Sequence, residues 1–377
     1  MPTADSDRLQ TRRARPGRAR RLLRTIVSPY YRYRHAKLFH SLRVGLAMLV
    51  SILATTGVDV PHGIWASVTL LVVIGGLQHH GNIRKKAADR AAGTLLGASI
   101  GLVLILQRDL IGSLPLTYVL MSVVAAICAW FAIGKAGYVA LLTAITMCIV
   151  AGHGENLMDV GLWRTLNVLV GIVIALAFSF ALPLHATYSW RYLLADNLRA
   201  CARLYARLVR GDSPPSADDT LKTFLALNAR LVQLRSLIPS VAKEIDVPQA
   251  RLEEMQRLHR AVLSALELMS TGTIAHLDAT GRAAFARECG IEVDAVRTTL
   301  LGMARALRFA GATRFHVPRA STLATQPDPA LLAGLPVDLH GPYWLGLRLA
   351  EQVDSLRALL LETEANWNIE QSTRVAA

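Results

Sequence analysis

Long apolar runs between Phe39 and Pro183 constrain this chain more than any other feature of its sequence. Within this stretch, runs close to 20 residues long carry few charged side chains, whereas the rest of the chain alternates charged and apolar residues. A helix needs about 20 predominantly apolar residues to cross the hydrocarbon core of a bilayer, which is about 30 Å thick. The sequence therefore predicts an integral membrane protein and argues against a soluble enzyme.

The apolar runs divide into six predicted transmembrane spans. We expect them at Phe39–Gly57, Gly63–Leu77, Ala91–Leu106, Leu116–Ile133, Tyr138–Ala151 and Leu162–Leu182. The second and fifth spans are short, so we expect a break, a small tilt or a locally thinned membrane at these positions.

Charge in the predicted loops sets the expected orientation. The loop Gln78–Arg90 holds four basic residues against a single acid, and the turn Gly134–Gly137 holds Lys135. The opposite loops Gly57–His62 and His153–Gly161 carry acids alone. Because basic loops remain in the cytoplasm, both termini are expected to be cytoplasmic, in the inner (plasma) membrane.

The segment before Leu38 is strongly basic, with eleven Arg or Lys residues against Asp5 and Asp7. A basic tail can bind nucleic acid, but next to a membrane span it is more often drawn to anionic lipid. We therefore expect residues 1–38 to be a cytoplasmic tail that contacts membrane lipids, and we expect no nucleic-acid partner.

Beyond Pro183 the pattern changes to amphipathic helices. Apolar residues recur every three or four positions in five stripes, at 194–208, 221–234, 252–266, 296–307 and 345–360. Gly211–Ser216 and Thr313–Pro342 are rich in turn-forming residues and are expected to be loops. The predicted fold is all-α, with a six-helix transmembrane bundle over 39–183 followed by a cytoplasmic helical bundle over 184–377.

Residues for catalysis or metal binding are scarce. The sequence lacks a phosphate-binding Gly-rich loop with Lys, a His-Glu-x-x-His motif and a Gly-x-Ser-x-Gly motif. The four cysteines are expected to be small buried residues without a disulfide or zinc role. The pair His79-His80 has no further ligand at suitable spacing. We expect no metal, no cofactor and no enzyme activity, although a membrane-anchored enzyme is a minor alternative.

Charged residues inside the predicted spans are more informative. Arg164 lies near the outer end of the sixth span, where a guanidinium in hydrocarbon costs several kcal/mol. Two interpretations stay open: a fixed charge that attracts anions, or a side chain that snorkels to headgroups or pairs with Glu155 or Asp159. Arg43 and Arg90 lie at the inner ends of spans one and three, where headgroup contact is expected.

A four-residue ladder of glycines runs along the third predicted span, at Gly93, Gly97 and Gly101. This spacing lets a second helix approach closely, so we expect it to serve helix packing.

Two short motifs are similar to those of a known family. Trp65-Ala-Ser-Val-Thr69, then Gln78, then Arg90-Ala-Ala-Gly-Thr-Leu-Leu-Gly97 resemble the fusaric-acid-resistance (FUSC) family, which includes bacterial aromatic acid exporters. Its membrane unit is similar to that of plant aluminium-activated malate channels. Arg164, Gly171 and Leu182-Pro183 extend the match into the sixth span. This chain departs from many members at His79, where they carry a proline.

The resemblance implies an architecture and a set of pore residues. A single membrane unit, where larger members have two, implies a homodimer with the pore at its interface. Arg164 would attract the anion and Arg90 would lie at the inner mouth. Trp65 and Thr69 would line the path, and Gly93, Thr94 and Gly97 would let helices approach closely around it. A periplasmic adaptor protein is a further possible partner.

The leading hypothesis is export of small organic anions, with aromatic carboxylates as the expected substrates. A rival hypothesis is a membrane scaffold or sensor that transports nothing and whose cytoplasmic helical domain binds a partner. The size of that domain favours the rival, because a simple pore does not require it. A channel and a proton-coupled carrier both fit the sequence, although the spans lack a central Asp or Glu.

Overall fold

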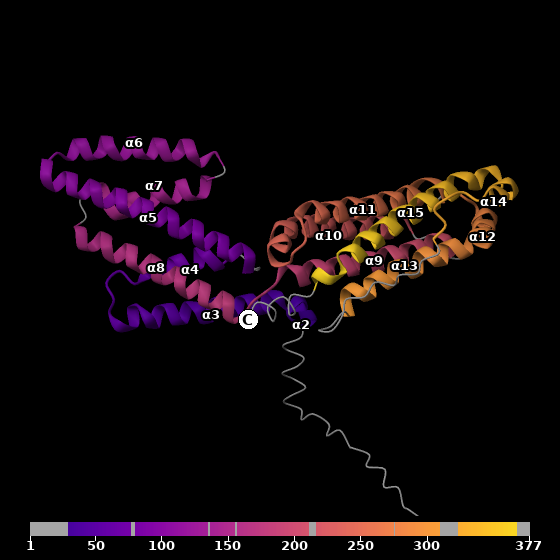
Figure 1. Ribbon diagram of the computed structural model, residues 1–377, viewed down its shortest axis with the longest axis horizontal. Coiled ribbons are helices and arrows are strands. Elements are labelled where there is room, and N and C mark those ends of the chain that lie inside the picture. The colour runs from indigo at the N-terminus through magenta and orange to yellow at the C-terminus, as the bar shows by residue number, and fades with distance from the viewer. Residues whose placement is uncertain are drawn as a thin grey trace, which may run out of the picture.

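The computed structural model describes residues 29–76, 80–134, 136–154, 157–210, 216–274, 276–309 and 323–367. All regular elements in these ranges are helical, as predicted (Figure 1). Most of the predicted basic tail, together with Gln78, His79, Lys135, Glu155 and most of the loop Gly211–Ser216, lies outside the described residues.

The first half of the chain forms seven described α-helices and two short 3-10 turns. The α-helices are α2 (Pro29–Arg34), α3 (Ala36–Ala54), α4 (Ile64–Ile74), α5 (His80–Ile111), α6 (Leu114–Ala132), α7 (Gly137–Ala151) and α8 (Met158–Ala181), with turns η1 (Thr56–Val58) and η2 (Gly152–Gly154).

Four of these segments are long and apolar enough to cross a membrane: Ala36–Val58, Lys85–Ile111, Leu114–Ala132 and Met158–Ala181. The second and fifth predicted spans form the shorter apolar helices α4, with 11 residues, and α7, with 15 residues. At 1.5 Å per residue, α7 is only about 22 Å long. The expected shortness of these two segments is therefore confirmed.

The basic segment expected to be a loop belongs mainly to helix α5. This helix begins at His80, eleven residues before the predicted start of the third span. Residues 84–92 consist of Arg, Lys, Ala and Asp without Gly or Pro, and most of these residues favour helix. The positive charge therefore lies on the first turns of a long helix and not on a loop.

The second half of the chain forms seven further α-helices. They are α9 (Ala186–Arg210), α10 (Ala217–Glu244), α11 (Gln249–Leu268), α12 (Ala279–Glu288), α13 (Gly290–Phe309), α14 (Pro329–Gly334) and α15 (Val337–Glu362), with a π-helical turn η3 (Met269–Thr273) and a 3-10 turn η4 (Glu364–Trp367). All five predicted stripes form helices, and their periodic apolar residues are buried or half-buried except Leu221 on α10. Leu225 and Val232, which lie in the same range but off the stripe, are exposed as well.

Part of the predicted loop Thr313–Pro342 is helical. Pro329 is the first residue of α14, and Pro336 is the N-cap of α15. Proline suits the first turn of a helix because its missing N–H would have no partner there. The Asp328 carboxylate accepts a hydrogen bond from Ala330 N at 2.9 Å and caps α14. Pro329 and Pro336 therefore start helices and Pro342 lies inside α15, where the sequence prediction placed a loop.

The apolar core of the described residues falls into separate clusters. The largest cluster lies between Ala186 and Trp367, and three smaller ones lie between Ala47 and Ala175. Figure 1 shows two groups of helices that follow one another along the longest axis. The first group comprises α3 to α8, and the second comprises α9 to α15. In the first group only 11% of the α6 candidate span is buried, and Trp130 and Phe131 are exposed. A large exposed apolar surface of this kind fits contact with lipid or another membrane helix.

The segment between α8 and α9 is held by hydrogen bonds from both groups. Arg43 Nη1, on α3, donates to Leu182 O at 3.3 Å. The Glu244 carboxylate, at the end of α10, accepts hydrogen bonds from Ala186 N, Thr187 N and Thr187 Oγ1, each at 2.9 Å. A carboxylate at a helix N-terminus satisfies free N–H groups and complements the helix dipole. Glu244 therefore fixes the start of α9.

The C-terminal end of the second group is anchored on the start of α9. The rings of Trp190 and Trp367 stack with centroids 4.9 Å apart. The buried Arg191 side chain donates from Nε to Leu307 O and from Nη1 to Trp367 O, each at 3.3 Å. Burial lowers the pKa of Arg191. These contacts join α9, α13 and η4.

A buried histidine lies among α9, α10 and α11. Arg230 Nη1 donates to Asn197 Oδ1 at 3.0 Å, which directs the Asn197 amide nitrogen to His259 Nε2 at 3.4 Å. His259 Nε2 must therefore accept, and the imidazole is neutral. Burial lowers the pKa of His259 to about 4.

Three of the four cysteines are buried, as expected, whereas Cys148 on α7 is exposed. All four are free thiols. Burial raises the pKa of both Cys201 and Cys289 to about 12, so these two thiols stay protonated and unreactive at neutral pH.

We predict that replacing Glu244 by alanine destabilises the protein by about 1–2 kcal/mol, because the first N–H groups of α9 lose a charged acceptor. Thermal unfolding of the purified protein in detergent, followed by circular dichroism, measures the loss. Glu267→Ala, which removes an exposed glutamate on α11, is the matched control. An unchanged midpoint for Glu244→Ala would contradict the capping role.

We also predict a pH dependence from His259. Its pKa is near 6.5 in the unfolded chain and about 4 in the folded one, so the unfolded state binds more protons between these values. The stabilisation is present above pH 6.5 and falls by about 3 kcal/mol as the pH drops to 4. Denaturant unfolding across this range should show a smaller pH dependence for His259→Gln than for the unchanged protein. The exposed His276→Gln should not alter it.

Candidate functional site

The glycine ladder of α5 lies directly against α7. A Cβ added to Gly93 would lie 2.7 Å from Leu142 Cβ, and one added to Gly101 would lie 2.8 Å from Val150 Cβ. At Gly97 the added carbon would overlap the carbonyl oxygen of Thr143. The expected close approach of a second helix is therefore present, and the partner is the short helix α7.

Arg90 lies at the end of this contact where α7 begins. Its side chain is 7% exposed and lies beside the phenol of Tyr138 on α7. Thr94, one turn further along α5, is fully buried. Within the described residues, Arg90 Nε and Thr94 Oγ1 have no hydrogen-bond partner. A buried polar atom without a partner costs free energy, so this end of the α5–α7 contact has unused capacity to bind a polar group.

The free hydroxyl of Thr94 is unusual among the threonines of these helices. Thr143 and Thr165 donate to the carbonyl four residues earlier, at 2.9 Å in both cases. Thr69 on α4 resembles Thr94, since it is fully buried and its hydroxyl has no partner among the described residues. Threonines usually form this local hydrogen bond in helices. Thr69 and Thr94 are thus the two buried hydroxyls of the predicted set that remain available.

Arg164, near the N-terminal end of α8, contacts the opposite end of α7. Its Nη1 donates to Ile149 O at 2.5 Å, near the last turn of that helix. No ion pair with Asp159 is formed, and Glu155 lies outside the described residues. The guanidinium is half-buried, and its Nε has no partner in the described part of the chain. Arg164 thus combines a contact to a helix end with a free N–H group.

The two arginines of the predicted set lie at opposite ends of one helix. Tyr138 and Ile149, their respective neighbours, are eleven residues apart on α7, which corresponds to about 17 Å. The structure therefore does not bring Arg90 and Arg164 into one site. It places one positive charge near each end of α7.

Trp65 lies on a separate contact, between α4 and α8. It is half-buried against the cluster formed by α3, α4, α5 and α8. The neighbouring Ala66 carbonyl lies so close to Gly171 that an added Cβ there would overlap it. Asn167 Nδ2 donates to Pro61 O at 2.8 Å and holds the loop before α4. Trp65 therefore lies at the α4–α8 contact, about one helical turn from Thr69.

Arg43 is a buried charge that the sequence prediction assigned to lipid headgroups. Its side chain is 0% exposed, and besides Leu182 O it contacts His40 Nδ1, to which Nη2 donates at 2.8 Å. The headgroup assignment is therefore wrong for Arg43, and the burial of Arg90 contradicts it there as well. His40, three residues before Arg43, was the one local signal of a polar partner.

The described residues contain no cluster of three or more His, Cys, Asp or Glu side chains that could hold a metal ion. His79, half of the histidine pair noted in the sequence, lies outside the described residues.

Comparison with known proteins places the chain in a family. The model of the fusaric acid resistance protein family matches residues 37–371, which include all the helices from α3 to η4. The chain belongs to this family. The resemblance based on Trp65, Thr69 and the segment Arg90–Gly97 is thereby confirmed.

A curated relative of this FUSC protein is "Inner membrane protein YeeA" of Escherichia coli (strain K12). The two are 34% identical over 238 residues, which make up 63% of this chain and 66% of that protein, slightly under two thirds of its length. Together with the apolar helices, this relationship identifies the FUSC chain as a membrane protein with transmembrane helices.

We predict that Gly97→Ala lowers the thermal midpoint in detergent by the equivalent of about 1–3 kcal/mol, because the added methyl meets backbone atoms of α7 that cannot move aside easily. Gly45→Ala is the matched control on α3, since nothing lies within 4 Å of the added Cβ there. Equal thermal midpoints for the two variants would show that α5 and α7 are not in close contact at Gly97 in the folded protein.

Proposed function

We propose that this FUSC protein exports small organic anions across the inner membrane, with aromatic carboxylates as the substrate class. The observation that carries the proposal is the pair of arginines near the two ends of α7. Each retains a buried Nε–H with no partner among the described residues. The name of the family, which refers to resistance to an organic acid, agrees with an anionic substrate.

Each predicted residue has a proposed role. Arg164 is half-buried and attracts the anion at the outer end of α7, while the more deeply buried Arg90 acts at the inner end. Thr69 and Thr94 offer free hydroxyls, and Trp65 offers an aromatic face for a planar substrate. Gly93 and Gly97 keep α7 close to α5 so that both arginines stay on the path.

The electrical potential supplies the driving force in this proposal. With a negative cytoplasm, each monovalent anion that leaves gains about 2.3 kcal/mol per 100 mV. Fixed positive charges along the path then suffice to lower the barrier for the anion. The route requires neither a covalent step nor ATP.

The topology that goes with this function is also a proposal. We infer six spans, with α4 and α7 as two short ones beside the four long helices, and both termini in the cytoplasm. The basic first turns of α5 favour this orientation, because Lys85, Lys86 and Arg90 would then face the cytoplasm. A homodimer, a periplasmic adaptor and lipid contacts of the N-terminal tail belong to the same proposal.

The rival function is a scaffold or sensor that carries no flux. It is favoured by the location of the largest apolar core, which lies between Ala186 and Trp367 and away from the candidate spans. Partner binding without anion flux would identify this function.

We predict that Arg164→Gln abolishes most of the potential-driven flux of a hydroxybenzoate in liposomes, whereas Arg164→Lys retains it. Lysine keeps both the charge and a donor on a long side chain, whereas glutamine is shorter and loses the charge together with the reach to Ile149 O. Thermal unfolding of each purified variant checks that the fold is intact.

Arg108→Gln is the control for this experiment, because it removes a positive charge from the last turn of α5 and leaves Arg164 on α8 in place. Undiminished flux in a folded Arg164→Gln protein would remove Arg164 from the path. A lack of flux in the unchanged protein, for hydroxybenzoate, chloride and malate alike, would favour the scaffold.

A further inference from the structure

A basic groove lies on the second group of helices, away from the candidate spans. Its volume is about 840 Å³, and its lining comes from α9, α10 and α13. Five basic side chains line it, namely Arg203, Arg207, Lys222, Arg230 and Arg297, against one acid, Asp219. The lining thus carries a formal charge of +4, from five cations and one carboxylate.

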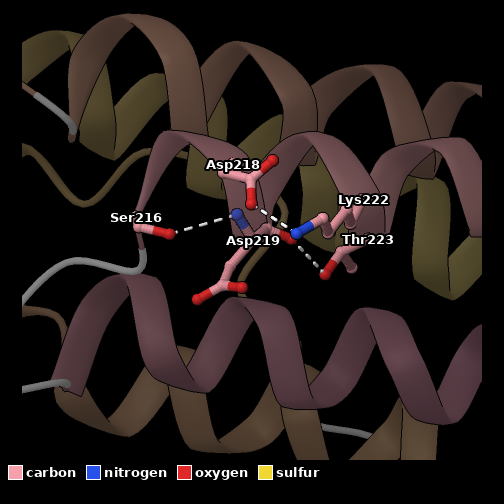
Figure 2. Close-up of polar contacts among 5 residues, drawn as sticks. All are labelled: Ser216, Asp218, Asp219, Lys222 and Thr223. Atoms are coloured by element: carbon pink, nitrogen blue, oxygen red, sulfur yellow. Dashed lines mark hydrogen bonds and ion pairs between the residues drawn. The ribbon is translucent and has the colours of Figure 1, made fainter.

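Most of this positive charge is not neutralised by the protein. Arg203, Arg207 and Arg297 form no ion pair or hydrogen bond with the described residues. Lys222 pairs with Asp218, which lies outside the lining, and Figure 2 shows the Asp219 carboxylate turned away from Lys222. Arg203 and Arg207 are four residues apart on α9, a spacing at which like charges repel. The groove therefore maintains a repulsive arrangement that a bound anion would relieve.

The groove is fixed in shape on two sides. Arg230 is half-buried, and its guanidinium is held by Asn197 Oδ1, which belongs to the buried network with His259. The Ser216 hydroxyl accepts a hydrogen bond from Asp219 N at 3.1 Å and caps the start of α10, as Figure 2 shows. Ala200, Ala206 and Ala226 are the small residues that leave room between the helices. Guanidinium groups bind planar or tetrahedral oxyanions with two parallel hydrogen bonds, and the contact to Asn197 holds that of Arg230 in place.

The position of the groove selects a soluble ligand over a lipid headgroup. Its α9 residues lie 14–21 positions after Ala186, which corresponds to about 21–32 Å along the helix. Figure 1 shows α9 running away from the first group of helices. Anionic headgroups at the end of α8 are therefore too distant to fill the groove.

We propose that this groove binds a soluble, phosphate-bearing anion with three or more negative charges. A monocarboxylate of the kind proposed for export would neutralise only one of the four net positive charges. A chain of linked phosphates matches the number of guanidinium groups, and the groove is large enough to accept it. This site is distinct from the arginines along α7, so its existence does not depend on the transport function.

The experiment is calorimetric titration of the full chain in detergent with inorganic tripolyphosphate at physiological ionic strength. We expect saturable binding, and we expect Arg203→Ala and Arg297→Ala each to weaken it about tenfold or more, as for loss of a charge-assisted hydrogen bond. Arg235→Ala is the matched control, because Arg235 is an exposed arginine on the same helix as Arg230 but does not line the groove. Its affinity should stay within about twofold of the unchanged protein.

Several results would overturn the proposal. One is the absence of saturable binding, and another is an equal loss in the Arg235→Ala control, which would indicate non-specific attraction to a basic protein. A third is groove-dependent binding of hydroxybenzoate without binding of tripolyphosphate. A fourth is displacement of tripolyphosphate by anionic phospholipid added to the micelles in a groove-dependent way, which would identify a lipid as the ligand.

Discussion

Carbonyl groups at helix ends need hydrogen-bond donors wherever water is scarce, and this need explains three polar side chains of the membrane helices. Arg164 donates to Ile149 O near the end of α7, and Arg43 donates to Leu182 O just after α8. Asn167 does the same for Pro61 O in the loop before α4. Each of these polar side chains belongs to a neighbouring helix. The hydrogen bond that satisfies a carbonyl group at one helix end therefore also holds two helices together.

The same requirement gives the candidate site its chemistry. A guanidinium has five N–H groups, and a single carbonyl uses only one of them. The buried Nε–H groups of Arg90 and Arg164 have no partner among the described residues and lie in a low-dielectric environment, where their interaction with an anion is strong. A contact to Ile149 O and an anion-attracting charge are therefore compatible in one residue.

Much of the helical fold could be predicted from the sequence, because hydropathy and the three-to-four-residue period report directly on local structure. The glycine ladder also indicated a close helix contact, although not that α7 would be the partner. The start of α5 was missed because charged residues suggested a loop, while helix propensity decided the conformation. The burial of Arg43 and the groove around Arg297 could not be predicted, since both arise from residues more than 60 positions apart. The period of apolar residues shows which face of a helix is buried. It does not show which residues elsewhere in the chain pack against that face.

The short connection between α8 and α9 has a mechanical consequence. Arg43 binds this connection at Leu182, and Glu244 binds it at Ala186 and Thr187. These hydrogen bonds limit the movement of the connection between the two helices. With its 25 residues, α9 extends about 37 Å from this point. Any rotation of α9 relative to α8 therefore has its pivot at residues 182–187. A rotation of about 5° at this pivot moves the far end of α9 by about 3 Å, and a force applied at that end exerts a large torque on α8.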